Sequence, residues 1–193
     1  LDSDKTLSWI IQNRDDAESF LARSHELRLE LARRDPNVFC ELVGRDEETG
    51  LPLQQSRIHR AFHRLAEKHN RLVLWSHIES SKTSSLAVLR TLWKLGNNPS
   101  LRIAIVSNTA GQATKIVKSI KNYIENSDAL HEVFPDLRPG DKWTDTAFTV
   151  ARATFAKDYS VQAVGVHGNV LGSRLDEVVM DDVLDLENTL TPH

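Results

Sequence analysis

The sequence has only one cysteine, Cys40, among its 193 residues, so it cannot form an internal disulfide. This is typical of proteins in a reducing compartment. It also lacks any apolar run long enough to span a bilayer, and it does not begin with the charged and then apolar leader of a secreted protein. We therefore expect neither a disulfide framework, a membrane span nor a secretory signal.

A strong excess of positive charge is missing as well, because the formal net charge is −3. Dedicated DNA-binding domains are usually basic, so the charge argues against tight duplex binding by this segment alone. It does not exclude a local basic face. The composition, 40% hydrophobic and 26% charged, is ordinary for a globular domain and sufficient for one sizeable core.

The first 70 residues carry helical patterns. Apolar residues recur at helical spacing, and Pro36 interrupts them because the residue before proline avoids helical angles. We expect helices over Asp15–Arg34, Val38–Val43 and Gln55–His69, with a polar loop over Gly44–Pro52.

The remaining residues alternate between short apolar runs and helical patterns. Strands are expected over Leu72–Trp75, Ile103–Val106, Phe148–Ala151, Ser160–Val166 and Glu177–Met180, helices over Lys82–Leu95 and from Thr109 to about Asn126, and a loop over Val133–Trp143. This order predicts an α/β fold with a parallel-rich sheet and helices on both faces. Ligands bind such sheets beyond the carboxyl ends of the strands.

The first of these strand ends carries Ser76–Thr83, with the sequence SHIESSKT. Its Lys82-Thr83 pair matches the end of the phosphate-binding pattern GxxxxGK[ST], in which backbone N–H groups hold phosphate. Serine occupies both glycine positions, and a left-handed serine carries a steric cost. The alternative is a solvated serine-rich loop that caps a helix, and the preceding strand and following helix favour the phosphate loop.

The last strand ends in two acids, Asp181 and Asp182. Mg-ATP chemistry needs one carboxylate near the metal and one near the attacking water. A strand that simply turns polar at its end is the alternative. The two strand ends together favour the catalytic interpretation.

Other polar residues are less specific. Arg174 could stabilise charge on a transferring phosphate, and Gln54 or Gln55 could bind an adenine edge. Each is otherwise an ordinary solvated residue. His59 and His63 lie one turn apart without further metal ligands, which indicates surface or packing positions. A lysine face that could contact DNA phosphates comprises Lys115, Lys118 and Lys121.

In this order, the motifs resemble those of the N-terminal ATPase domain of tailed-phage terminase large subunits. The resemblance covers roughly Leu51 to Asn188. It rests on LPLQQ at 51–55, HIESSKT at 77–83, IAIVSNT at 103–109, VFPDL at 133–137, the loop at 168–174 and VVMDD at 178–182.

The resemblance implies a role for each matching residue. Lys82, Asp182 and Arg174 would be catalytic, Arg174 as an arginine finger toward a neighbouring subunit. Thr83 and Asp181 would hold Mg²⁺. The ATP-binding residues would be Gln55 (or Gln54), Ser76, His77, Ile78, Glu79, Ser80, Ser81, Lys82 and Thr83.

It also implies an ATP-hydrolysing motor that drives double-stranded DNA into a procapsid. Its partners would be a ring of its own copies, the portal protein and the small terminase subunit, in the host cytoplasm and without a membrane. Residues 1–50 would be a helical lid or docking segment. Residues 51–193 would be a P-loop core whose later strands and nuclease domain lie beyond the segment, so we expect no nuclease activity here. The alternatives are a helicase-like or RecA-like ATPase, or a degenerate nucleotide-binding assembly module.

Overall fold

A computed structural model of the chain describes residues 14–46, 48–77, 80–154, 156–168 and 174–184. Its first part contains three helices, α2 (Arg14–Arg34), α3 (Pro36–Val43) and α4 (Arg57–Lys68). The break after α2 arises because Pro36 begins α3 while the Asp35 side chain caps it by accepting from the Asn37 N–H. These helices confirm the three predicted ones, and every boundary agrees to within two residues.

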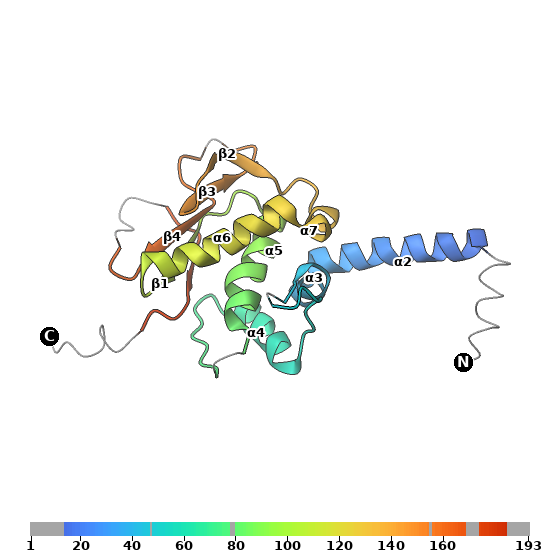
Figure 1. Ribbon diagram of the computed structural model, residues 1–193, viewed down its shortest axis with the longest axis horizontal. Helices are drawn as coiled ribbons and strands as arrows, with labels where there is room; N and C mark the ends of the chain where they lie inside the picture. Colours follow the sequence, from blue (N-terminus) through green and yellow to red (C-terminus); the bar gives the residue numbers. More distant parts are fainter. Residues whose placement is uncertain (1–13, 47, 78–79, 155, 169–173, 185–193) are drawn as a thin grey trace.

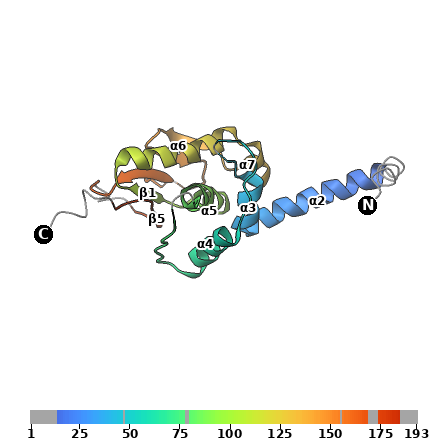
Figure 2. The ribbon, with the colours of Figure 1, turned by 60° about the horizontal axis from the view of Figure 1, so that its bottom comes forward.

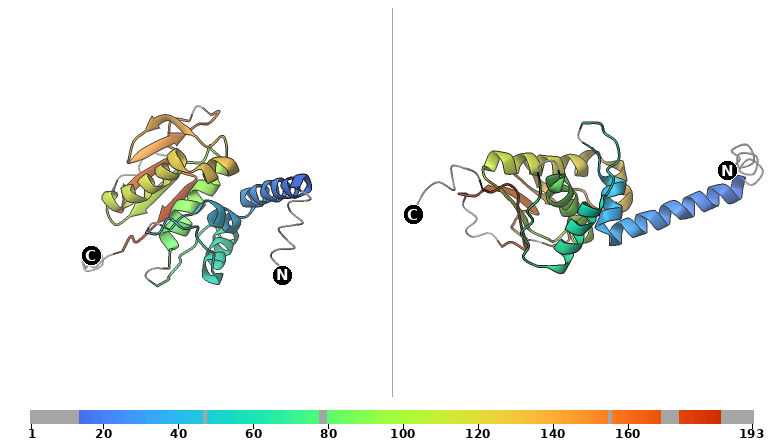
Figure 3. Two further views of the ribbon diagram at one scale, coloured as in Figure 1. Left: turned by 45° about the vertical axis from the view of Figure 1, so that its right-hand side comes forward. Right: turned by 90° about the horizontal axis from the view of Figure 1, so that it is seen from below.

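Helix α2 extends away from the rest of the molecule (Figure 1 and Figure 3). Its carboxyl-terminal part packs on α3, α5 and α7, and Ala32 is fully buried there. Farther out, Phe20, Leu21 and Leu27 are more than half exposed. Helix α2 is thus anchored only at its end.

The second part forms the α/β unit. Its helices are η1 (Thr83–Leu89, a π-helix), α5 (Arg90–Asn97), α6 (Ala110–Asn126) and α7 (Asp128–Val133). Its strands are β1 (Ile103–Ser107), β2 (Pro139–Trp143), β3 (Ala147–Val150), β4 (Val161–Gly165) and β5 (Glu177–Met180). Helix α6 begins where predicted, because the Thr109 side chain accepts from the Gln112 N–H.

The five strands form one mixed sheet in the order β2-β3-β4-β1-β5. Strand β1 pairs in parallel with β4 and β5, whereas β2-β3 and β3-β4 are antiparallel. The predicted α/β class is confirmed, with three strands of the sheet in the expected parallel arrangement. The carboxyl ends of β4, β1 and β5 therefore lie at one edge.

Helices η1, α5 and α6 cover one face of the sheet, where Ile103 and Ile105 of β1 enter the main core. Figure 2 shows α6 running along the strands. On the other face, Ala104 and Val106 join a small cluster that contains no helical residue in the described part of the chain. In the described part of the chain, helices therefore cover one face of the sheet and not both faces as predicted.

The predicted strand Leu72–Trp75 is wrong. Residues 72–77 have no regular secondary structure, and Val73 and Trp75 are 89% and 92% exposed. An apolar run forms a strand only when its backbone pairs with a neighbour, and this one pairs with no strand among the described residues. Strand β5 consequently ends the sheet, and its outer edge is unpaired among the described residues.

The predicted loop Val133–Trp143 is also partly wrong, because it contains β2 and follows directly on α7. The proline at position 139 suggested a loop, but β2 is the other edge strand, where a missing N–H is tolerated. None of the described helices combines the length and apolar character needed to cross a membrane.

Candidate functional site

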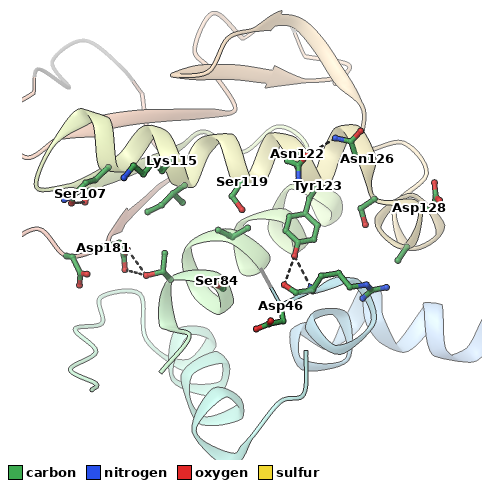
Figure 4. Close-up of a pocket in the computed structure, with 18 residues that line it drawn as sticks. Asp46, Ser84, Ser107, Lys115, Ser119, Asn122, Tyr123, Asn126, Asp128 and Asp181 are labelled. Carbon is green, nitrogen blue, oxygen red and sulfur yellow. Dashed lines mark hydrogen bonds between the residues drawn. The ribbon is translucent and has the colours of Figure 1, made fainter. Parts of the chain in front are cut away.

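Two segments that are about 100 residues apart in sequence meet beyond the carboxyl ends of β1 and β5. The Asp181 N–H continues the pairing of β5 by donating to the Val106 carbonyl at 2.9 Å. The Thr83 hydroxyl donates to both carboxylate oxygens of Asp181, at 3.0 and 2.8 Å. The start of η1 is thereby joined to the end of β5 (Figure 4).

The next residue of each segment forms a second link. Lys82 Nζ lies 3.7 Å from Asp182 Oδ1, with Lys82 25% exposed and Asp182 70% exposed. The structure therefore brings together four predicted site residues, two from each motif. A hydroxyl, an ammonium and two carboxylates face one another at the sheet edge where ligands of parallel strands bind.

Backbone strain is concentrated at the same place. Among the described residues, the non-glycine positions with positive φ are Ser81 at 52° and Asp182 at 46°. Ser81 directly precedes Lys82, and its carbonyl accepts the Ser85 N–H at 2.9 Å. Left-handed non-glycine residues are costly and cluster at functional sites. The serine in the glycine position thus adopts the conformation for which glycine is normally used.

A cavity of about 910 Å³ opens beside this cluster and runs along α6. Its near end contains Thr83, Asp181 and Asp182, and α6 lines its length (Figure 4). The cavity is also lined by residues that were not predicted to bind ATP, including Ser84, Ser107, Gln112, Lys115, Ser119 and Asn122. Ser107 could have been found, because it ends a buried parallel strand.

Among the described residues, the other side chains predicted to bind ATP do not line this cavity. Gln55 is buried, its N–H donates to Glu41 Oε1 at 3.2 Å, and its Oε1 has no hydrogen-bond partner among the described residues. The hydroxyls of Ser76 and Ser80 are likewise buried without a partner there. His77 lies in the same irregular segment as Ser76, whereas Ile78 and Glu79 fall outside the described residues.

Arg174 lies at the opposite end of β5 from Asp181. It precedes the strand, and the following Asp176 pairs with Arg102 at the amino end of β1. The expectation that Arg174 lies near the binding edge is therefore wrong, because a residue before a parallel strand lies at the amino edge. The four residues of β5 alone separate it from the site by roughly 10 Å. Arg174 therefore lies at the opposite edge of the sheet from the candidate site of its own subunit.

The predicted lysine face is divided. Lys118 and Lys121 both pair with Asp145, at 2.9 and 3.0 Å. Lys115 instead lines the cavity. A continuous row of cations toward DNA is therefore not formed by these three side chains.

Comparison with known proteins identifies a relative. The sequence is 31% identical over 127 residues to a protein named "Terminase, large subunit" from Enterobacteria phage T3. This chain is related to terminase large subunits. The match covers 66% of the chain and 21% of the relative, so the chain spans about a fifth of the relative's length. No protein-family model matches the sequence.

The terminase relationship confirms the resemblance drawn from the ordered motifs. At Ser81 the chain departs from the phosphate-loop pattern GxxxxGK[ST], because a serine with positive φ stands where the pattern has glycine. For the Mg-ATP binding proposed below, we expect Ser81→Gly to raise the affinity by up to about fivefold, because glycine avoids a steric cost of about 1 kcal/mol. Calorimetric titration of both proteins measures the change. Weaker binding by the glycine variant would mean that the Ser81 hydroxyl itself contacts the ligand.

The electrostatics of the site center on Asp181. Burial raises the pKa of this carboxyl above its ordinary value of 3.8; the Thr83 hydrogen bond opposes the shift, the charge of Asp182 adds to it and Lys82 opposes it. Because the pKa in the folded state is the higher one, the ionised carboxylate lowers stability. The contribution of Asp181 to the stability of the fold is therefore most favourable below pH 3.8, and it is lost as the pH rises through the folded-state pKa.

We accordingly expect Asp181→Asn to raise the melting temperature at pH 7, with the gain vanishing as the pH falls toward 4. Asparagine keeps an acceptor for Thr83 without the buried charge. Each 1 kcal/mol gained raises the melting temperature by about 2–4 °C in a chain of this size. Asp182→Asn is the matched control, since Asp182 is mostly exposed and should change little. A pH-independent difference would assign the effect to packing.

Proposed function

We propose that this chain binds Mg-ATP at the Thr83–Asp181 cluster and hydrolyses it as the motor segment of a DNA-packaging terminase. The observation that carries the proposal is the meeting of Lys82-Thr83 with Asp181-Asp182 at the carboxyl edge of the sheet. A solvated serine-rich loop and a polar strand end have no reason to converge. The adjoining cavity is within the usual size range of ligand sites.

Each residue has a role that follows from its chemistry. Lys82 binds the outer phosphates, because its ammonium is the nearest cation to the start of η1 and its present partner Asp182 is exposed. Asp182 orients the attacking water and takes up its proton. Ser76, His77, Ile78, Glu79, Ser80 and Ser81 would contact the phosphates, as the sequence pattern predicts.

The donor set also fits magnesium. The described residues contain no cluster of three His, Cys, Asp or Glu side chains that could hold a metal ion. Magnesium commonly uses one or two protein oxygens together with waters and substrate phosphates. Thr83 Oγ1 and the Asp181 carboxylate, already within 3.0 Å of each other, supply such a pair. Bound there, the ion would neutralise charge on the phosphates.

The wider role follows the terminase relationship. In the proposed motor, several copies form a ring at the portal of a procapsid in the host cytoplasm, aided by the small terminase subunit, and drive double-stranded DNA inward. Arg174 would reach the site of the next copy, since it lies at the opposite end of β5 from its own. Gln55 would bind adenine through its unpartnered Oε1 if the base lies toward α4 rather than along α6.

The test is a calorimetric titration with ATP in the presence of magnesium and again with a chelator. We expect saturable binding that weakens strongly without the metal, and a co-crystal with density for phosphates beside Ser81–Thr83. Absence of binding would contradict the proposal. Binding without turnover in assembled rings would instead favour a nucleotide-binding assembly module.

A further inference from the structure

Helix α4 contacts the two sides of the phosphate loop through two histidines. His59 Nε2 lies 3.1 Å from the Ser80 carbonyl oxygen, and His63 Nε2 lies 3.0 Å from the Ser85 hydroxyl. Ser80 immediately precedes the strained Ser81, and Ser85 is the residue whose N–H closes the turn onto the Ser81 carbonyl. The two histidines are one helical turn apart, so both face the loop from the same side of α4.

The tautomer of the neutral His59 ring follows from its hydrogen-bond partners. The Ser56 N–H donates to His59 Nδ1 at 3.1 Å, and a backbone N–H can only donate. Nδ1 therefore carries the lone pair, and the proton of the neutral ring is on Nε2. It follows that Nε2–H donates to the Ser80 carbonyl, and both ring nitrogens are in use.

His63 is enclosed between α3, α4 and η1. It is fully buried and lies 3.5 Å from the Cys40 sulfur as well as beside Ser85. Burial, together with the positive charge of nearby Arg90, lowers the pKa of His63 to about 4. A neutral ring in this position can hold Ser85 without bringing charge into the core.

We infer that His59 and His63 position the phosphate loop by fixing Ser80 and Ser85 on either side of Ser81. This inference rests on the proposed function for the use of the loop. A residue in a costly backbone region persists only where its surroundings hold it there. The usual glycine needs no such support, whereas Ser81 does. The histidine pair supplies it, so that Lys82 and Thr83 stay beside Asp182 and Asp181, respectively.

Two substitutions separate the hydrogen bond from the rest of the ring. Asparagine at position 59 keeps an acceptor where Nδ1 is and loses the bond to Ser80, whereas glutamine places an amide N–H where Nε2 is. Amide exchange of the peptide over residues 80–85, measured without nucleotide, should be several-fold faster in His59→Asn. The rate in His59→Gln should resemble the wild type. Equal exchange in the wild type and His59→Asn would overturn the inference, as would equal damage by both variants.

Nucleotide affinity is the second readout. His59→Asn should raise the Kd for Mg-ATP about two- to tenfold, the range expected for one neutral hydrogen bond, while His59→Gln restores it. Ser85→Ala tests the other side, since it removes the partner of His63 and leaves the buried ring in place. It should weaken binding in the same direction, and unchanged affinity would remove His63 from the inference. Failure of the wild type to bind Mg-ATP would contradict the proposed function. The exchange rates test separately whether His59 and His63 position the loop.

Discussion

Arg174→Ala is expected to leave Mg-ATP binding near normal and to lower turnover by assembled rings by about 10³-fold or more. An arginine finger contributes about 10³ to 10⁵ in rate in well-characterised phosphoryl transfer. Because Arg174 lies at the amino end of β5 and the carboxylates at the other, we expect its contribution to reach a neighbouring site only. ATP turnover at matched ring concentration measures the loss. Arg23→Ala, on the exposed part of α2, is the control for removal of an arginine.

Mixed rings give the deciding form of this experiment. Arg174→Ala and Asp182→Asn subunits are each expected to be inactive alone. Combined, some interfaces pair an intact arginine with an intact carboxylate site, so part of the turnover should return. If confirmed mixed rings stay inactive, action between subunits is refuted. Full activity of Arg174→Ala alone would exclude the residue from the mechanism.

Lys82→Ala has the second largest expected effect, a loss of Mg-ATP affinity of about 30- to 150-fold. This corresponds to about 2–3 kcal/mol, the value of a charge-assisted contact to phosphate. Titration calorimetry of the wild type and the variant measures it. Lys118→Ala is the matched control, because it removes the same charge from a surface pair with Asp145 away from the cluster.

Two results would contradict the role of Lys82. Equal affinity in the wild type and Lys82→Ala would show that the ammonium does not touch the phosphates. An equal loss in Lys118→Ala would show that only overall charge matters. Slow turnover by the isolated wild-type chain would not contradict the role of Lys82, since the proposed arginine finger comes from a neighbouring subunit.

The helices could be predicted well because their signals are local. Asp35 and Thr109 are capping residues at the beginnings of α3 and α6, and both caps are formed. Strands β1 and β5 were predicted from their short apolar runs and pair with each other; β1 is buried along its whole length, whereas β5 is partly exposed. Where a strand and the strand that pairs with it were both marked by apolar runs, the sequence pattern was sufficient to predict them.

What failed depends on contacts that the sequence does not specify locally. Residues 72–75 have the same apolar character as β1, but no strand of the described part of the chain pairs with them, and Val73 and Trp75 stay exposed. The π-helical winding of Thr83–Leu89 has no sequence signal that distinguishes it from an α-helix. The position of Arg174 was misjudged because its place along a strand matters more than its proximity in sequence to Asp181.

For the candidate site, the motifs identified the four residues that meet but not their surroundings. Lys82-Thr83 and Asp181-Asp182 follow recognisable patterns at strand ends. His59 and His63 were interpreted as surface or packing residues, since their partners Ser80 and Ser85 are identifiable only once α4 is placed against the loop. Supporting contacts of this kind come from tertiary structure.

The unpaired edge of β5 has a practical consequence for handling this segment in solution. Among the described residues no strand pairs with the backbone groups along that edge, and Val178 and Met180 beside them are 46% and 67% exposed. Such an edge can add strands from other molecules, which promotes aggregation. Light scattering of concentrated samples would therefore report sticky, unspecific association as well as closed assemblies. Only particles of uniform mass, seen by native mass spectrometry, should be counted as rings in the turnover experiments.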